Sequence, residues 1–183
     1  AFLQAGMSLA ALMGELIEER RAHPTDDLTS KLVHNQLPED LLTPAEITSL
    51  FVLLAVAGND TTRTGITHGV NLLSKNPDQR EIWRADLDGV TQSAVEEIVR
   101  VASPVTFMRR TATGDVTLAG EKFHDGDKFV MFYGAANRDP RVFTDPERFD
   151  VRRTPNPHVG FGGPGPHFCL GANLARRELA VVF

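Results

Sequence analysis

The sequence predicts a mainly α-helical protein with a small β region. Over most of the chain, apolar residues recur at helical spacing in segments that begin at capping residues and end at proline or glycine. Between residues 107 and 133 the pattern changes to short β-type segments separated by turn signals. Hydrophobic residues make up 42% of the 183, which suffices for a core, and no internal repeat is visible.

The N-terminal region is expected to form two helices. Apolar residues recur at helical spacing up to about Ala22, where a His-Pro pair ends the first helix. The second is short, covers residues 27–35 and has Asp26 or Asp27 as its capping residue. A loop is then expected at Leu37, Pro38 and Asp40.

The longest predicted element is a helix that ends at about Lys75. Thr43 and Glu46 form the pattern of a capping box around Pro44, a favoured residue in the first helical position. Asn76-Pro77 ends the helix. Some 32 residues at ~1.5 Å each give a length of roughly 48 Å, enough to cross a whole domain.

The middle of this helix contains residues that disfavour it. Residues 58–62 read Gly-Asn-Asp-Thr-Thr, and these residue types have low helix propensity. A threonine hydroxyl can also bond to the carbonyl four residues earlier and bend the helix. Such a conflict inside an apolar helix indicates a functional site, although a polar patch facing solvent would have the same composition.

Two further helices are expected over residues 77–87 and 91–102, separated by Asp88-Gly89. In the second, Glu97 and Arg100 are three residues apart and therefore share one face. An exposed pair of this kind contributes only about 0–1 kcal/mol.

Short strands are predicted over residues 107–113, 116–118, 121–123 and 128–133. Ala119-Gly120 and Asp125-Gly126 supply the turns between them. Residues 137–149 are rich in Asp, Arg and Pro and are expected to be irregular.

The only cysteine, Cys169, follows a glycine-rich loop stiffened by Pro164 and Pro166. A helical pattern begins just after it, and a helix N-terminus favours the thiolate form of a nearby cysteine. A lone thiolate on a rigid loop suits an axial ligand of haem iron. A buried cysteine that acts as a small hydrophobic residue is the common alternative.

Two other interpretations of this loop fit less well. Structural zinc needs about four ligands, and only His158 and His167 lie near Cys169 in sequence. Gly160, Gly162 and Gly165 match a G-x-G-x-x-G pattern, but that pattern indicates dinucleotide binding only inside a βαβ unit. No G-K-[ST] follows, which excludes a P-loop.

The net charge, the cysteine count and the length of the apolar runs limit the partners and the location that can be expected. The formal net charge of −5 and pI near 5.7 argue against nucleic acid. A single cysteine excludes an internal disulfide and fits a reducing cytosol, so a cytoplasmic location is expected. The longest apolar run, Leu50 to Ala57, has eight residues, whereas a membrane span needs about 20. No signal peptide is visible.

The loop resembles the cysteine-ligand loop of the cytochrome P-450 family, the haem-thiolate monooxygenases. The matching residues are Phe161, Gly162, Gly165, His167, Cys169 and Gly171. Phe161 lies eight residues before the cysteine, where the commonest family pattern has seven. A bacterial branch acting on sterol side chains and methyl-branched lipids resembles this longer loop, although it tends to have Glu at the position of Asp60 and Trp at that of Val101.

The resemblance implies an incomplete cytochrome P-450 fold. Residues 1–183 would be one partial haem-thiolate monooxygenase domain that lacks the N-terminal helices and the extreme C-terminus. On that basis the fragment alone is expected to be inactive and not to hold haem stably.

Two more motifs carry the resemblance. Asp60 and Thr61 match the acid–alcohol pair of the family's A-G-x-D-T-T distal helix, with a catalytic role in proton delivery. Glu97 and Arg100 match its E-x-x-R, and Arg148 in P-E-R-F would be the third partner of a buried structural network. Arg110, rather than its neighbour Arg109, would bind a haem propionate together with His167.

The remaining residue roles follow from the same resemblance. Cys169 would be the metal ligand, and the residues around the cofactor would be His167, Arg110, Phe161, Gly163, Gly171 and Ala57. The substrate pocket would contain Leu53, Val105, Thr106 and Phe107, although these apolar positions could equally be core.

The implied function is monooxygenation with heme b (iron protoporphyrin IX): one oxygen atom of O2 enters a lipophilic substrate, a steroid or methyl-branched lipid. No flavin or reductase motif is present, so NAD(P)H electrons would arrive through a separate ferredoxin and ferredoxin reductase. Arg176 and Arg177 are either part of that docking face or an ordinary solvated helix surface. A haem-sensing module without turnover is the alternative function, and a nucleotide-binding protein is a third.

Overall fold

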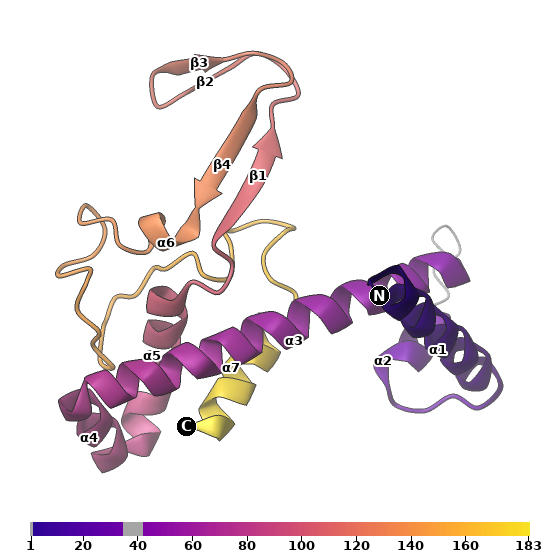
Figure 1. The fold of residues 1–183 in the computed structure, drawn as a ribbon, viewed down its shortest axis with the longest axis horizontal. Coiled ribbons are helices and arrows are strands. Elements are labelled where there is room, and N and C mark those ends of the chain that lie inside the picture. Colours follow the sequence, from indigo (N-terminus) through magenta and orange to yellow (C-terminus); the bar gives the residue numbers. More distant parts are fainter. Residues whose placement is uncertain (1, 35–41) are drawn as a thin grey trace. The chain divides into compact units, whose positions relative to one another are not determined.

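A computed structural model describes residues 2–34 and 42–183 (Figure 1). The chain forms two compact units, Ala1–Asn59 and Asp60–Phe183. Helices dominate both, and the strands found among the described residues are short and lie in the second unit, so the predicted fold class of mainly α with a small β region is confirmed.

The first unit contains α1 (Phe2–Ala22), α2 (Leu28–Val33) and the beginning of α3. Met13, Ile17 and Ile47 form its buried core. The predicted cap of the second helix is Asp27, whose Oδ1 accepts a hydrogen bond from the Ser30 amide at 2.7 Å. The loop expected at Leu37, Pro38 and Asp40 lies outside the described residues.

The long helix α3 spans Pro44–Lys75, as predicted. Its capping box is complete: the Thr43 amide donates to Glu46 Oε2 at 2.7 Å, and the Glu46 amide donates to Thr43 Oγ1 at 3.3 Å. Towards its C-terminal end, α3 packs closely on the last helix. A Cβ at Gly69 would stand only 2.5 Å from the Phe183 ring, so this helix crossing requires a residue without a side chain.

The predicted boundary between the next two helices is wrong. The helices α4 (Pro77–Ala85) and α5 (Leu87–Ala102) meet at Asp86, and Gly89 lies inside the first turn of α5. Gly89 had indicated a helix break, but its amide donates to the Asp86 carboxylate at 2.9 Å. The glycine therefore marks a capped start, because a Cβ there would collide with that carboxylate.

The β region consists of two separate hairpins. Antiparallel β1 (Phe107–Thr111) and β4 (Lys128–Phe132) pair in one, and β2 (Val116–Leu118) and β3 (Glu121–Phe123) pair in the other. The first and last strands end slightly earlier than predicted. A short helix that the sequence did not predict, α6 (Tyr133–Ala136), follows β4. The segment after it is irregular up to residue 149, as expected.

Helix α5 is the centre of the second unit. One side packs into a core that α3, α4 and the irregular segment share: Leu73, Trp83, Val90, Ala94, Ile98, Phe149 and Val151. The adjacent face carries Val95 and Val99, which are buried with Leu179 of α7 (Ala172–Val182). This double burial fixes the position of the polar side chains on the remaining faces of α5.

Candidate functional site

The loop before α7 closes on itself around Cys169. The Cys169 amide donates to the Phe161 carbonyl at 3.0 Å, which brings the two ends of the glycine-rich segment together. Within it, the Phe168 amide donates to the Gly165 carbonyl at 3.0 Å. The side chain of Cys169 is exposed, and α7 begins three residues later. A buried, inert cysteine is therefore excluded.

The same loop is fixed against α5 and α6. A Cβ at Gly160 would lie 2.6 Å from Val99 Cγ1, so the backbone passes directly over α5. Next to it, the Val159 amide donates to the Asn137 side-chain oxygen at 2.8 Å. Asn137 is fully buried and also donates to Ser103 Oγ at 2.9 Å.

Glu97 of α5 is the buried anchor of the region. Its carboxylate and the Arg100 guanidinium have no exposed surface, and Arg100 donates to both carboxylate oxygens at 2.7 and 2.8 Å. The same carboxylate accepts hydrogen bonds from the Asp150 amide at 3.0 Å, from Arg153 Nε at 3.1 Å and from Asn156 Nδ2 at 3.1 Å. A pair of this kind requires full hydrogen bonding to compensate for burial, and here it has that bonding.

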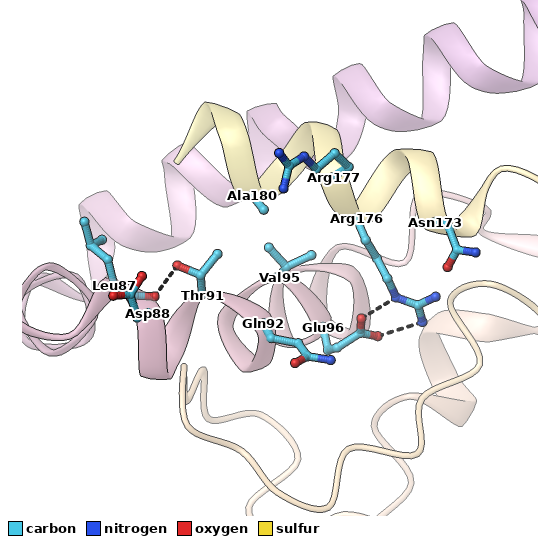
Figure 2. Close-up of a pocket in the computed structure, with 10 residues that line it drawn as sticks. All are labelled: Leu87, Asp88, Thr91, Gln92, Val95, Glu96, Asn173, Arg176, Arg177 and Ala180. Carbon is cyan, nitrogen blue, oxygen red and sulfur yellow. Dashed lines mark hydrogen bonds and ion pairs between the residues drawn. The ribbon is translucent and has the colours of Figure 1, made fainter.

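The neighbouring residue, Glu96, joins α5 to both flanks of the cysteine loop. The Gly160 amide donates to His158 Nδ1 at 3.1 Å, so the ring proton is on Nε2, which donates to Glu96 at 2.7 Å. Arg176 of α7 donates to both oxygens of the same carboxylate (Figure 2). Burial raises the pKa of the Glu96 carboxyl, but the bonds from His158 and Arg176 prevail and lower it to about 2.

Figure 2 also shows the shallow groove between α5 and α7 that Arg176 borders. It has a volume of about 550 Å³. Glu96, Arg176 and Arg177 lie along it with Val95 and Ala180. The acidic side chain of Glu96 faces the basic residues of α7, so much of the groove's charge is paired internally.

Asp60 and Thr61 lie in the part of α3 that belongs to the second unit. Asp60 Oδ1 forms an ion pair with Arg63, and the side chains of Asp60 and Arg63 are 70% and 71% exposed. Thr61 is partly buried and lies one turn before Gly65, where an added Cβ would stand 3.6 Å from the side chain of Leu179 of α7. Arg63 had not been predicted as part of the site; its i,i+3 spacing from Asp60 was the available signal.

Among the described ranges 2–34 and 42–183, no group of three or more His, Cys, Asp or Glu side chains is arranged to hold a metal ion. Cys169 is a single sulfur donor, and the iron of a porphyrin is a metal that takes one axial cysteine ligand.

Comparison with known proteins decides the family. The model of the family described as Cytochrome P-450 matches residues 2–183. The chain belongs to the cytochrome P-450 family. A methyl-branched lipid omega-hydroxylase of Mycobacterium tuberculosis is 54% identical over 182 residues, which is 100% of this chain and 42% of that protein. A steroid C26-monooxygenase of Mycolicibacterium smegmatis is 45% identical, covering 92% of this chain and 39% of that protein.

Solved cytochrome P-450 structures share the fold. CYP268A2 of Mycobacterium marinum in complex with pseudoionone has a TM-score of 0.92 and 50% identity, covering 97% of this chain and 43% of that one. CYP109E1 of Bacillus megaterium in complex with testosterone has a TM-score of 0.93 and 38% identity, with 98% and 49% covered. The predicted partial cytochrome P-450 fold and the resemblance to lipid- and sterol-hydroxylating relatives are confirmed. The chain spans less than half the length of these proteins.

The prediction that the Arg148 side chain joins the E-x-x-R network of the cytochrome P-450 fold is wrong. Arg148 takes part through its carbonyl, which accepts from Arg100 at 3.0 Å and from Arg153 at 2.8 Å, while the guanidinium of Arg153 reaches Glu97. Phe149 is buried, and the preceding side chain therefore points outward. Arg153 was absent from the sequence prediction because no motif distinguishes it from the neighbouring Arg152.

Other residues assigned by resemblance are exposed in this part of the cytochrome P-450 fold. Arg110 donates to the Arg109 carbonyl at 3.0 Å, and both arginines are exposed. His167 is exposed beside Cys169. Glycines 163 and 171 border open space, since an added Cβ would meet nothing within 4 Å at either position. Arg176, considered as a docking residue, is bonded to Glu96.

The predicted substrate residues come from two segments. Leu53 and Ala57 are exposed and lie one turn apart on α3. Val105 and Thr106 lead into β1, where the exposed Phe107 ring lies 6.0 Å from that of Phe132. Throughout the described residues, no helix combines the length and apolar character that crossing a membrane requires.

Proposed function

We propose that this chain is the C-terminal part of a haem-dependent monooxygenase that inserts one oxygen atom of O2 into a lipophilic substrate. The observation that carries the proposal is the exposed Cys169 thiol, on a closed loop, in a chain of the cytochrome P-450 family. The relatives cover the whole chain but extend well beyond it, which supports residues 1–183 as one partial domain that needs further segments to enclose haem.

The residues of the loop fit heme b. Cys169 would be the iron ligand, His167 and Arg110 would bind the propionates, and Phe161, Gly163, Gly171 and Ala57 would line the cofactor. When bound, the haem supplies oxygen activation, which thiolate ligation favours. The hydrogen bond from the Cys169 amide to the Phe161 carbonyl restrains the backbone that carries the sulfur. Glu97 and Arg100, together with Arg148 through its carbonyl, would hold the irregular segment after α6 on α5.

Proton delivery is assigned to Asp60 and Thr61. The Asp60 carboxylate would collect a proton from solvent, to which it is exposed, and the Thr61 hydroxyl would pass it to the reacting oxygen. Arg63 holds the carboxylate at the surface of α3 and would have to release it during transfer.

Replacement of Thr61 by alanine should leave haem binding unchanged but separate O2 consumption from product formation. Because a positioned proton donor contributes about 10²–10⁴-fold, product formation should fall at least about tenfold. Measuring O2 uptake, hydrogen peroxide and product in parallel checks this. Thr62→Ala, which alters the adjacent hydroxyl, is the matched control and should stay close to the unmodified enzyme. Equal coupling in both variants would remove Thr61 from the proton path.

The substrate is proposed to be a methyl-branched lipid or a steroid. The methyl-branched lipid omega-hydroxylase and the steroid C26-monooxygenase among the relatives support that class, as do the apolar residues Leu53, Val105 and Phe107, with Thr106 as the one hydroxyl among them. Electrons would come from NAD(P)H through a ferredoxin and its reductase, in the cytoplasm. A panel of sterols and branched fatty acids, screened for substrate-induced shifts of the haem spectrum, would identify the class.

The central experiment is the ferrous–carbon monoxide spectrum of the full-length enzyme and of residues 1–183 alone. We expect the red-shifted Soret band of thiolate ligation in the full-length enzyme and no stable haem in the shorter chain. A full-length protein without that band would refute the proposed function. A normal band with no NAD(P)H consumption under any donor would favour a haem sensor instead.

A further inference from the structure

Glu96 and Arg176 lie outside every motif described above, yet they connect α5 to the cysteine loop. The Arg176 side chain crosses from α7 to Glu96 on α5 (Figure 2). Resting on the proposed function, we propose that Arg176, held in place by Glu96, is the positioning residue of the cysteine loop. It would fix the ring of Phe161 and orient the backbone of Cys169.

The first step is the clamp at Glu96. Its carboxylate accepts from His158 at the entrance of the loop and from Arg176 in the helix that leaves it. The side chain of His158 is only 4% exposed and that of Glu96 is 20% exposed. One carboxylate therefore holds both ends of the loop, and it does so largely away from solvent, where ion pairs are screened less.

The second step leads from the clamp to the cysteine. The Arg176 guanidinium stacks on the Phe161 ring, with 4.5 Å between the guanidinium carbon and the ring centroid. The carbonyl of Phe161 accepts the hydrogen bond from the Cys169 amide at 3.0 Å. The path from Glu96 to the Cys169 backbone consequently has three contacts, and each one is direct.

The third step is electrostatic. The pKa of the Arg176 guanidinium lies above its usual value, chiefly because of its hydrogen bonds to Glu96, and burial opposes this. The hydrogen bonds to Glu96 therefore hold a charged side chain in a fixed position, and outer-shell partners of metal sites that are held in this way commonly orient the ligand.

The neighbouring Arg177 provides a matched control. It follows Arg176 on α7, has the same side chain and is exposed. An ordinary solvated helix surface would make the two arginines equivalent, whereas a positioning role applies to Arg176 alone.

The test uses the full-length enzyme with Arg176→Met, Arg176→Lys, Glu96→Gln and the control Arg177→Met. The first readout is the rate of haem loss to an excess of a haem-scavenging protein. The second is the share of the ferrous–carbon monoxide complex in the thiolate band, formed by chemical reduction so that no protein donor is needed. Outer-shell substitutions commonly weaken metal binding about 10–100-fold. We expect about tenfold faster haem loss and a smaller thiolate band for Arg176→Met and Glu96→Gln, a partial return for Arg176→Lys, and no change for Arg177→Met.

A third readout does not depend on haem. Amide hydrogen exchange of the peptide that contains Cys169 should accelerate in Arg176→Met and Glu96→Gln but not in Arg177→Met, because the loop would open locally more often. The positioning role would be overturned by unchanged exchange, or by a wild-type spectrum and haem-loss rate, in Arg176→Met and Glu96→Gln. Equal effects of Arg176→Met and Arg177→Met would also overturn it. An unmodified enzyme that lacks the thiolate band would refute the proposed function instead, and hydrogen exchange would still decide the role of Arg176.

Discussion

Replacement of Cys169 by serine should abolish the red-shifted Soret band of the ferrous–carbon monoxide complex. A serine hydroxyl remains protonated near neutral pH and cannot donate charge to iron as a thiolate does, so the spectrum should become that of haem without thiolate ligation. Cys169 is the only cysteine in these 183 residues and its side chain is exposed, so no neighbouring thiol of this chain can replace it. Product formation should be lost with the band.

The substitution is best measured beside Thr61→Ala in the same full-length enzyme. Both changes are small and both affect a proposed site residue, but only Cys169→Ser should change the ligand field of the iron. Haem content by pyridine extraction separates altered ligation from loss of the cofactor. A wild-type band in Cys169→Ser would show that the sulfur of this loop is not the ligand.

Replacement of Glu97 by glutamine should lower the free energy of unfolding by about 3–5 kcal/mol, because the guanidinium of Arg100 would stay buried without its counter-charge. The loss is large since both side chains have no exposed surface. Urea unfolding, followed by circular dichroism, gives the difference. Glu81→Gln is the matched control: Glu81 pairs with Arg84 at the same i,i+3 spacing, but the side chains are 57% and 71% exposed. That change should cost no more than about 0.5 kcal/mol.

Substitutions of Arg153 and Arg148 test which arginine side chain belongs to the Glu97 network. Arg153→Met should destabilise the protein clearly, because its guanidinium bonds to Glu97 and is 10% exposed. Arg148→Met should have a small effect, because the carbonyl that it contributes to the network remains after substitution. The reverse order would restore the assignment that the P-E-R-F motif suggested. Equal, small effects of Glu97→Gln and Glu81→Gln would contradict a buried ion network altogether.

Signals that depend on neighbouring residues predicted the fold well. The capping box at Thr43, the proline after residue 75 and the turn at Ala119-Gly120 each act within a few residues, and the structure has all three where expected. The helix break predicted at Gly89 was wrong because it also depended on a local signal alone. Its local meaning is ambiguous, since a glycine that follows an aspartate cap by three residues begins a helix while the same glycine elsewhere ends one.

The site was harder to predict where its contacts join distant segments. Cys169, Glu97 and Arg100 follow from motifs, but Arg153 and Glu96 do not, because their partners lie 56 and 62 or more residues away in sequence. Two arginines in a row, such as those at positions 152 and 153, look equivalent until packing turns one of them inward. A sequence pattern contains propensity and spacing, whereas the choice between neighbouring side chains depends on which face the tertiary structure buries.

The carboxylate of Glu97 also constrains the order of folding. Its donors Asp150, Arg153 and Asn156 lie 53 to 59 residues further along the chain. Helix α5 can form from local interactions, but the loop-closure entropy of these distant contacts must be overcome before the carboxylate gains its donors. The irregular segment after α6 has no strand ladder of its own, so its order depends on tertiary contacts such as those of Glu97 and Arg100 and the burial of Phe149. We infer that it acquires its native conformation late, on a helix that is already in place.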